Sequence, residues 1–374
     1  MEQYDVVVVG AGLAGLVAAR GLAERGASVL VVDRRGVVDE RVATTGIFVR
    51  RTLEDFDLPE DCLGPPVRDV VLASPAGREL HLTSDKVEYR VGRMGRLYRS
   101  WLDGAVAAGA VWAPSTTFVA AVRAPDRRVS LTLQTADSPR PVTARFLIGA
   151  DGSQSAVARA LGLDVNRREI VGAETVHRGV PLDGPAHFRC VLDPHIAPGY
   201  LAWVVHDGEE VHVGVGGQVR RYAVAQALRL FTQRMQALYN LDRGELIERR
   251  GGRIPVGGVL PRIANAGGLL VGDAAGAVSP LTAGGLDPCL RLSGFAVEVA
   301  LAYLGSGDPA ALARYDGRWF RRRFRKRLAL RNALVALWTP TALELGCALL
   351  RTPPGRGVAR DVFFGRGSFP DPPR

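Results

Sequence analysis

The beginning of the chain contains the feature that most restricts how it can fold. Residues 4–9 include four consecutive valines, which is typical of a strand covered on both faces of a parallel sheet. The strand leads into Gly10-Ala11-Gly12-Leu13-Ala14-Gly15, and apolar residues then recur at helical spacing to about Ala23. A second strand over residues 28–32 ends at Asp33. This segment therefore predicts a complete strand–helix–strand unit of the Rossmann type.

The glycine turn in this unit predicts a dinucleotide-binding site. Gly10 permits a tight turn, Gly12 lets a pyrophosphate approach the backbone, and Gly15 lets the helix pack closely on the strand. Unpaired N–H groups at the helix N-terminus attract phosphate. An acid at the end of the second strand accepts hydrogen bonds from the ribose, which disfavours NADP but does not separate NAD from FAD. The residues expected to contact the dinucleotide are Gly10, Gly12, Leu13, Ala14, Gly15, Asp33 and Arg34.

Two further glycine clusters each follow a buried strand and precede a helix. They are Gly149-Ala150-Asp151-Gly152-Ser153 and Gly272-Asp273-Ala274-Ala275-Gly276. In this order, the three clusters resemble those of the flavoprotein superfamily that includes para-hydroxybenzoate hydroxylase, flavin-dependent halogenases and geranylgeranyl reductases. The resemblance implies that the dinucleotide is FAD. It places Asp151 and Gly152 near the pyrophosphate, and Gly272 and Asp273 at the ribityl chain, whereas Asp273 alone could also cap the following helix.

The loop after the third cluster, Val278 to Leu286, is expected beside the flavin ring. In the resembled superfamily this loop contacts the isoalloxazine, and the next helix directs its N-terminus at the ring. Unpaired N–H groups at Gly284, Gly285 and Leu286 would stabilise the negative charge of a reduced flavin. Pro280 completes this expected set. Arg93 is assigned to the FAD phosphates, with a solvated surface role as the alternative.

Within the superfamily, two segments resemble geranylgeranyl reductases. Pro280-Leu281-Thr282-Ala283-Gly284-Gly285 is similar to their Pro-Leu-Thr-Gly-Gly-Gly run, and residues 199–206 are similar to their Tyr-x-Trp-x-Phe-Pro signature. A substrate pocket is accordingly expected at Tyr200, Trp203 and His206, although the two aromatic residues could instead serve only the core. The chain departs from the family where Thr44-Thr45 lies near the position of a loop cysteine.

The function expected from these motifs is that of an FAD-dependent oxidoreductase. It would reduce a C=C or C=N bond of an apolar or isoprenoid-like substrate with electrons from NADH or NADPH. The alternatives are an FAD-dependent monooxygenase of natural-product biosynthesis, a halogenase and a non-catalytic flavin-binding protein. A halogenase needs an active-site lysine in the FAD domain, and the only lysines of this chain are Lys86 and Lys326. His206 and His212 are candidate proton donors.

The alternation of buried and amphipathic strands predicts an α/β fold with interleaved domains. A Rossmann-like FAD-binding domain is expected from residues 1–58, 91–165 and 263–307. An antiparallel-sheet substrate domain is expected from residues 59–90 and 166–262. Residues 308–374 are expected to form a helical, basic C-terminal region.

Charge and cysteine content limit the partners and the compartment. The net charge of +10 is nearly all arginine, and no nucleic-acid recognition motif accompanies it, so no nucleic acid is expected. The four cysteines lack metal-ligand spacing, so we expect no metal site and a cytoplasmic location. Phe320, Phe324 and Leu328 share one helical stripe among arginines. This helix would either cap the substrate cavity or associate peripherally with an anionic membrane surface.

Overall fold

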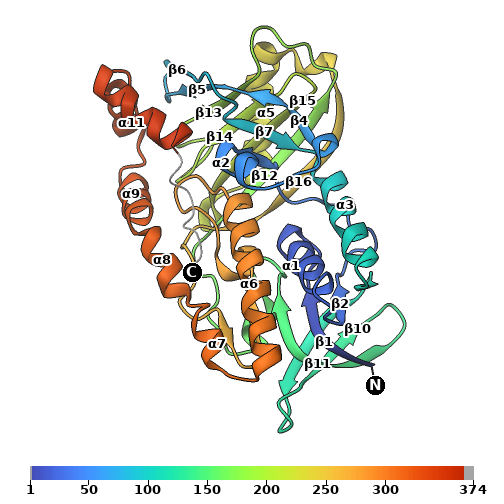
Figure 1. Ribbon diagram of the computed structural model, residues 1–374. Helices are drawn as coiled ribbons and strands as arrows, with labels where there is room; N and C mark the ends of the chain where they lie inside the picture. The colour runs from blue at the N-terminus through green and yellow to red at the C-terminus, as the bar shows by residue number, and fades with distance from the viewer. Residues whose placement is uncertain (1, 366–374) are drawn as a thin grey trace.

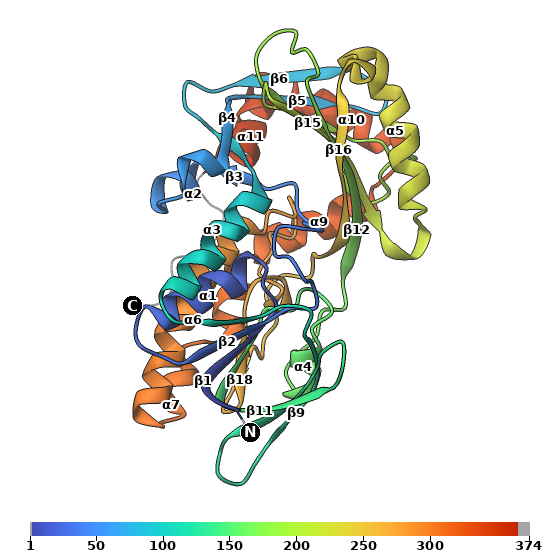
Figure 2. The same cartoon turned by 90° about the vertical axis from the view of Figure 1, so that its right-hand side faces the viewer.

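The computed structural model describes residues 2–365 and contains two large β-sheets (Figures 1 and 2). The first sheet has the strand order β17-β18-β11-β1-β2-β8, and β10 and β9 extend it from β11. Its central strands run parallel, and Val6 to Val9 of β1 are buried between β2 and β11, as the valine run predicts. The strands are β1 (Glu2–Val9), β2 (Val29–Val32), β8 (Val111–Ala113), β9 (Thr117–Arg123), β10 (Val129–Gln134), β11 (Pro139–Gly149), β17 (Ala264–Asn265) and β18 (Gly268–Leu270).

Helices cover this first sheet and bury the largest hydrophobic core of the protein. The contacts between α1 and both α3 and α6 are extensive, and Figure 1 shows α1 and α6 lying side by side. The helix α6 is apolar and long enough to span a membrane, but more than half of it is buried in the core, which makes it weak evidence for a span. The helices of this part are α1 (Leu13–Ala23), α3 (Met94–Ala107), α4 (Ala156–Ala160) and α6 (Leu286–Ser306), with the short helix η4 (Gly272–Ala275).

The second sheet has seven strands in the order β16-β12-β15-β14-β13-β5-β6 and is antiparallel except where β13 pairs with β5. Helix α5 packs on the outer face of this sheet, against β12 and β15 (Figure 2). The strands are β5 (Asp69–Ala73), β6 (Glu79–Thr83), β12 (Glu169–Arg178), β13 (His187–Val191), β14 (Ala202–His206), β15 (Glu210–Gln218) and β16 (Glu245–Pro255), and α5 spans Val224–Tyr239.

A small three-stranded sheet lies between the two large ones. Its order is β3-β7-β4, and α2 follows β3 directly. The chain thus leaves the first sheet after β2, contributes β5 and β6 to the second sheet, and returns at β8. This topology gives the expected α/β class with interleaved sheets. The elements are β3 (Ile47–Val49), α2 (Arg50–Asp55), η1 (Glu60–Cys62), β4 (Leu63–Val67), β7 (Tyr89–Gly92), η2 (Val219–Arg221) and η3 (Leu241–Arg243).

The C-terminal region is helical up to the last described residues. In Figure 1 its helices run along one edge of the molecule, from α7 beside α6 to α11 near the second sheet. They are α7 (Ala310–Ala313), α8 (Gly317–Arg323), α9 (Arg325–Ala336), α10 (Pro340–Leu350) and α11 (Pro353–Phe364). The final residues 366–374 of the expected C-terminal region lie outside the described part of the chain.

The stripe at Phe320 and Phe324 neither faces a membrane nor caps the substrate sheet. Both side chains are fully buried, and Phe320 packs against Phe295 of α6 and against Tyr315. The two interpretations of this helix are therefore wrong for its apolar stripe, which belongs to the core of the first sheet. The amphipathic pattern identified the buried side of α8 but not the surface that covers it.

We expect Phe320→Ala to destabilise the protein by about 3–5 kcal/mol, because it leaves a cavity among buried aromatic rings. Leu345→Ala is the matched control, since this leucine of α10 is 64% exposed and its truncation should change stability by about 0.5 kcal/mol or less. Chemical denaturation of the full chain measures both values. Equal stability of the two variants would show that α8 does not belong to the core.

Candidate active site

The first glycine turn is shaped by close packing on one side and open space on the other. Gly10 has a φ of +105°, and a Cβ there would lie 2.3 Å from the carbonyl oxygen of Ala150. A Cβ at Gly15 would lie 1.9 Å from the carbonyl oxygen of Gly10. A Cβ at Gly12, in contrast, meets no atom within 4 Å. Because no side chain caps α1 within residues 2–365, its first N–H groups, those of Leu13 and Ala14 included, remain available to a phosphate in that space.

Asp33 at the end of β2 fixes the turn from the other side. Its Oδ2 accepts the N–H of Ala11 at 2.7 Å, and both of its oxygens accept from the guanidinium of Arg35 at 3.0 Å. Burial opposes ionisation of Asp33, but the hydrogen bonds and charge of Arg35 outweigh it, so the pKa lies below its usual value. Arg34 is exposed. Sequence reasoning missed Arg35, whose signal was only its position two residues after the acid.

The second cluster is fixed by its own acid. Asp151 accepts hydrogen bonds from the Ser155 hydroxyl at 2.6 Å and from the N–H groups of Ala156 and Val157 at 2.6 and 3.1 Å. The carboxylate thus holds the start of α4, while Gly152, with a φ of +81°, has open space where a side chain would be. A pyrophosphate could approach this cluster through the backbone of Gly152 rather than through the carboxylate.

Asp273 in the third cluster differs from the other two acids because its carboxylate has no hydrogen-bond donor among residues 2–365. It is partly buried, and burial followed by the charge of Glu169 raises its pKa to about 6. A Cβ built on Gly285 would lie 3.7 Å from its Oδ1, which places Asp273 beside the predicted flavin loop. A partly buried acceptor without a donor fits the hydroxyls of a ribityl chain.

The predicted flavin loop is held by both neighbouring sheets. Tyr200 donates its hydroxyl proton to the carbonyl of Thr282 at 2.7 Å. Arg331 of α9 donates to the carbonyls of Pro280 at 3.2 Å and Gly199 at 3.3 Å, and so joins the loop to the turn before β14. No side chain within the described residues caps α6 at Gly285. The first N–H groups of this helix, next to the loop, therefore have no side-chain acceptor. Nothing in the sequence singled out Arg331 from the other arginines.

Tyr200 and Trp203 lie flat against the inner face of the second sheet. A Cβ at Gly214 would lie 2.2 Å from the Trp203 ring, and one at Gly216 would lie 2.7 Å from the Tyr200 ring. The two glycines of β15 therefore make room for the two rings. Both rings belong to a buried apolar cluster against which Ala283 of the flavin loop packs. The structure thus brings these two predicted residues to the flavin loop.

His206, the third residue of the expected pocket, lies on the opposite face of the sheet. Successive side chains of a strand alternate between faces, so Trp203 and His206 cannot share one. The His206 ring lies 6.4 Å from the Tyr239 ring of α5, and its Nε2 is 3.3 Å from the carbonyl oxygen of Pro181. It lines a small cavity of about 140 Å³ there. The prediction that His206 joins the substrate pocket is therefore wrong.

Arg93 does not point its charge at a phosphate site in this structure. Its guanidinium contacts Asp207 at 2.9 Å, Glu209 at 2.6 Å and Glu210 at 3.1 Å. Asp207 and Glu209 belong to the turn between β14 and β15, and Glu210 is the first residue of β15. These acids already match the charge of Arg93, which contradicts its assignment to the FAD phosphates.

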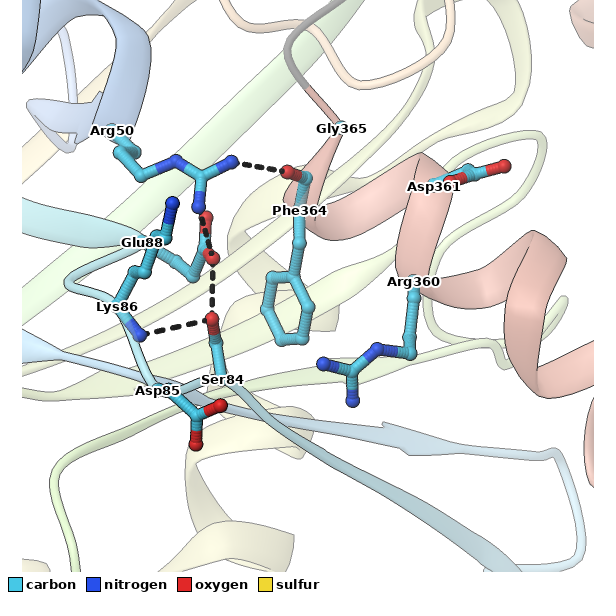
Figure 3. A pocket seen from close by; sticks show the side chains of 9 residues that line it. All are labelled: Arg50, Ser84, Asp85, Lys86, Glu88, Arg360, Asp361, Phe364 and Gly365. Carbon is cyan, nitrogen blue, oxygen red and sulfur yellow. Dashed lines mark hydrogen bonds and ion pairs between the residues drawn. The ribbon is translucent and has the colours of Figure 1, made fainter.

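A cavity of about 310 Å³ lies where α11 meets the turn between β6 and β7 (Figure 3). Arg50 crosses it, contacting Glu88 at 3.1 Å and the carbonyl of Phe364 at 3.2 Å. Its lining is polar and includes Lys86 and Arg360. None of the lining residues belongs to the glycine turns or to the flavin loop. It is therefore separate from the predicted cofactor site.

Comparison with known families agrees with the three glycine clusters. Two models described as FAD binding domain match residues 5–71 and 96–329. Together they include the first turn, the second and third clusters and the flavin loop. The protein is accordingly an FAD-dependent oxidoreductase.

Individual relatives narrow the family further. Digeranylgeranylglycerophospholipid reductase 1 from Methanopyrus kandleri is 31% identical over 97% of this chain and all of its own length. The structure of a geranylgeranyl bacteriochlorophyll reductase-like protein from Thermoplasma acidophilum superposes with a TM-score of 0.84 at 22% identity, covering 98% of both chains. A p-nitrophenol 4-monooxygenase from Pseudomonas putida shares the fold at a TM-score of 0.71 and 18% identity, covering 98% of this chain and 95% of its own. The chain belongs to the geranylgeranyl reductase family of FAD-dependent oxidoreductases.

Proposed function

We propose that this protein reduces C=C bonds in the isoprenoid chains of a lipid such as a digeranylgeranylglycerophospholipid, with NADH or NADPH as the source of electrons. The observation that carries the proposal is the apolar face formed by Tyr200 and Trp203 directly beside the flavin loop. The name and the 31% identity of the methanogen relative support the same substrate class.

Different residues of this chain would bind different parts of the cofactor. The N–H groups at Gly12 and Leu13 would hold the pyrophosphate, and Asp273 would accept hydrogen bonds from the ribityl hydroxyls. The N–H groups from Gly284 to Leu286, at the uncapped start of α6, would stabilise negative charge on the ring. When bound, FAD supplies the hydride for the double bond. Thr282 and Pro280 keep the loop in place through Tyr200 and Arg331.

A continuous set of apolar side chains could line the path of a long isoprenoid chain. Ile47, Phe188 and Leu201 pack against the cluster of Tyr200 and Trp203 and also against a second cluster that reaches α11. An extended isoprenoid could follow this set from the flavin loop toward the C-terminal helices. A small polar substrate would gain nothing from such surroundings.

A monooxygenase remains the second candidate, since the p-nitrophenol 4-monooxygenase has the same fold. We expect the FAD-loaded protein, once reduced under anaerobic conditions, to be reoxidised by a digeranylgeranylglycerophospholipid, with two hydrogens added to the lipid per double bond. Mass spectrometry of the lipid and flavin absorbance measure this. A product that carries oxygen and forms only in air would replace the reductase by the monooxygenase.

We further propose peripheral association with the cytoplasmic membrane surface through α10 and α11. Leu345, Leu349 and Val358 on these helices are well exposed. The same segment contains Arg351 and Arg356 and few acids, which suits an anionic surface. These residues differ from the buried stripe of α8. A lipid substrate could enter from such a surface.

We expect the double variant Leu345→Ser, Leu349→Ser to bind phosphatidylglycerol vesicles about tenfold more weakly, because two apolar side chains no longer enter the interface. The matched control is Val119→Ser, Val122→Ser, which removes two exposed valines from β9. Vesicle flotation measures both. Equal binding by the two double variants would contradict a docking role for α10.

Asp273→Asn tests the cofactor site independently of turnover. Loss of a charged acceptor should weaken FAD binding about tenfold or more. In the wild type, FAD affinity should rise as the pH increases through about 6, because only the ionised carboxylate accepts two hydroxyls. The variant should lose this pH dependence. Fluorescence titration with FAD measures both effects, and an unchanged affinity would contradict the assignment.

The same substitution should stabilise the FAD-free protein at neutral pH. A raised pKa means that folding favours the neutral carboxyl, so this contribution is complete below the ordinary value of 3.8 and is lost as the pH rises through about 6. Asn avoids this loss, and we expect a gain of about 2 kcal/mol at pH ~7.5 and none at pH ~4. Asp137→Asn, at an exposed loop position, is the control for which no such difference is expected.

A further inference from the structure

A buried acid–base pair lies on the same face of the second sheet as Trp203. Glu174 of β12 is 3% exposed and His212 of β15 is fully buried. Their Oε1 and Nδ1 atoms are 3.2 Å apart. The other carboxylate oxygen, Oε2, accepts the indole N–H of Trp203 at 2.9 Å and the hydroxyl of Thr45 at 2.5 Å. A charged pair at this depth is costly to keep, and apolar residues would serve packing alone at least as well.

The pair is connected to the surface on its other side. The Nε2 of His212 has no hydrogen-bond partner among residues 2–365, but the Oε2 of Glu210 lies 3.5 Å away. Glu210 in turn pairs at 2.7 Å with Arg178, whose side chain is 61% exposed. Burial opposes ionisation of Glu210, but its contacts with His212, Arg178 and Arg93 lower its pKa to about 2. An ionised carboxylate therefore links His212 to the protein surface.

The charges around the pair favour its ionised form. Burial alone would lower the pKa of His212, but the charge and hydrogen bond of Glu174 raise it above 6.5. Burial alone would raise the pKa of Glu174, but the charge of His212 lowers it. From β16, Arg250 faces Glu174 at 3.6 Å while pairing with Glu248 at 2.6 Å. His212 therefore holds a proton that Glu174 can receive.

Thr45 lies at the end of this series that is away from Glu210, where it shares the Oε2 of Glu174 with Trp203. It belongs to the loop between β2 and β3 and is partly exposed. Arg250 fixes the loop through the carbonyl of Thr44 at 2.9 Å. Trp203, which shares the Oε2 of Glu174 with Thr45, packs in the cluster that also contacts the flavin loop.

We propose that Thr45, Glu174 and His212 form a proton relay that supplies the proton for double-bond reduction. The inference rests on the proposed function. The bound flavin would supply a hydride to one alkene carbon, and the Thr45 hydroxyl would supply the proton that the other carbon takes up with the former π electron pair. Thr45 regains a proton from Glu174, Glu174 from His212, and His212 from solvent, while the ionised Glu210 stabilises the positive charge of His212. Thr45 touches the substrate, whereas Glu174 and His212 act through it.

Thr45→Val tests the relay at the substrate end, because valine has the shape of threonine without the hydroxyl. We expect anaerobic lipid reduction to fall about a hundredfold, with FAD affinity and thermal stability close to wild type. Thr45→Ser keeps the hydroxyl and should recover most of the rate. The matched control is Thr175→Val, which removes a buried hydroxyl on the opposite face of β12 and should leave the rate unchanged.

Glu174→Gln tests the acid–base pair without relying on turnover. Imidazole NMR of the FAD-free protein should show a lower pKa for His212 than in the wild type, since the carboxylate of Glu174 no longer opposes the effect of burial. In the wild type, the reduction rate should decline as the pH rises through the pKa that NMR gives for His212. A purely structural role would not make the two titrations coincide.

The outcomes separate the relay from the proposed function. If the wild type does not reduce the isoprenoid lipid, the proposed function and the relay both fail. If the wild type reduces the lipid and Thr45→Val does so at the same rate, only the relay fails. The relay also fails if the pH dependence of the rate is the same in Glu174→Gln as in wild type.

Discussion

The close contact between the first two glycine turns is the constraint on which the site depends. A Cβ at Gly10 would lie only 2.3 Å from the Ala150 carbonyl oxygen, so the ends of β1 and β11 can meet this closely only if residue 10 has no side chain. Strands β18, β11, β1 and β2 run parallel, which brings their carboxyl ends to one edge of the sheet. Three clusters separated by more than a hundred residues therefore converge there, where dinucleotides bind in such folds.

This first sheet and its cofactor site could be predicted from the sequence because each signal is local. A buried strand, a glycine turn and a helix follow one another in the chain, and parallel pairing then determines where the turns lie. The antiparallel sheet offered no such guide. His206 was misplaced because β14 begins only at Ala202, and the sequence does not show which of its alternating side chains face the flavin loop. Arg93 was misplaced because its partners are more than a hundred residues away.

Glu174 and His212 stand out in the sequence as titratable residues within strands, but only the strand register shows that they lie together. Each is a titratable residue within a strand of mostly apolar or small residues, and β12 pairs with β15 so that Glu174 lies opposite Gly214. The same face uses Gly214 and Gly216, which weaken a strand, to admit two aromatic rings. A buried ion pair and strand glycines both lower stability. Stability alone would not favour their concentration on the single face toward the flavin loop.

The C-terminal helices, which the sequence presented as one basic region, have three different roles in the structure. Helix α8 completes the core under α6, while α10 and α11 expose apolar side chains. Helix α9 lies between these and uses Arg331 to join the flavin loop to the turn before Tyr200. Because Tyr200 also bonds the loop directly, the flavin ring and the substrate face are positioned by the same few hydrogen bonds.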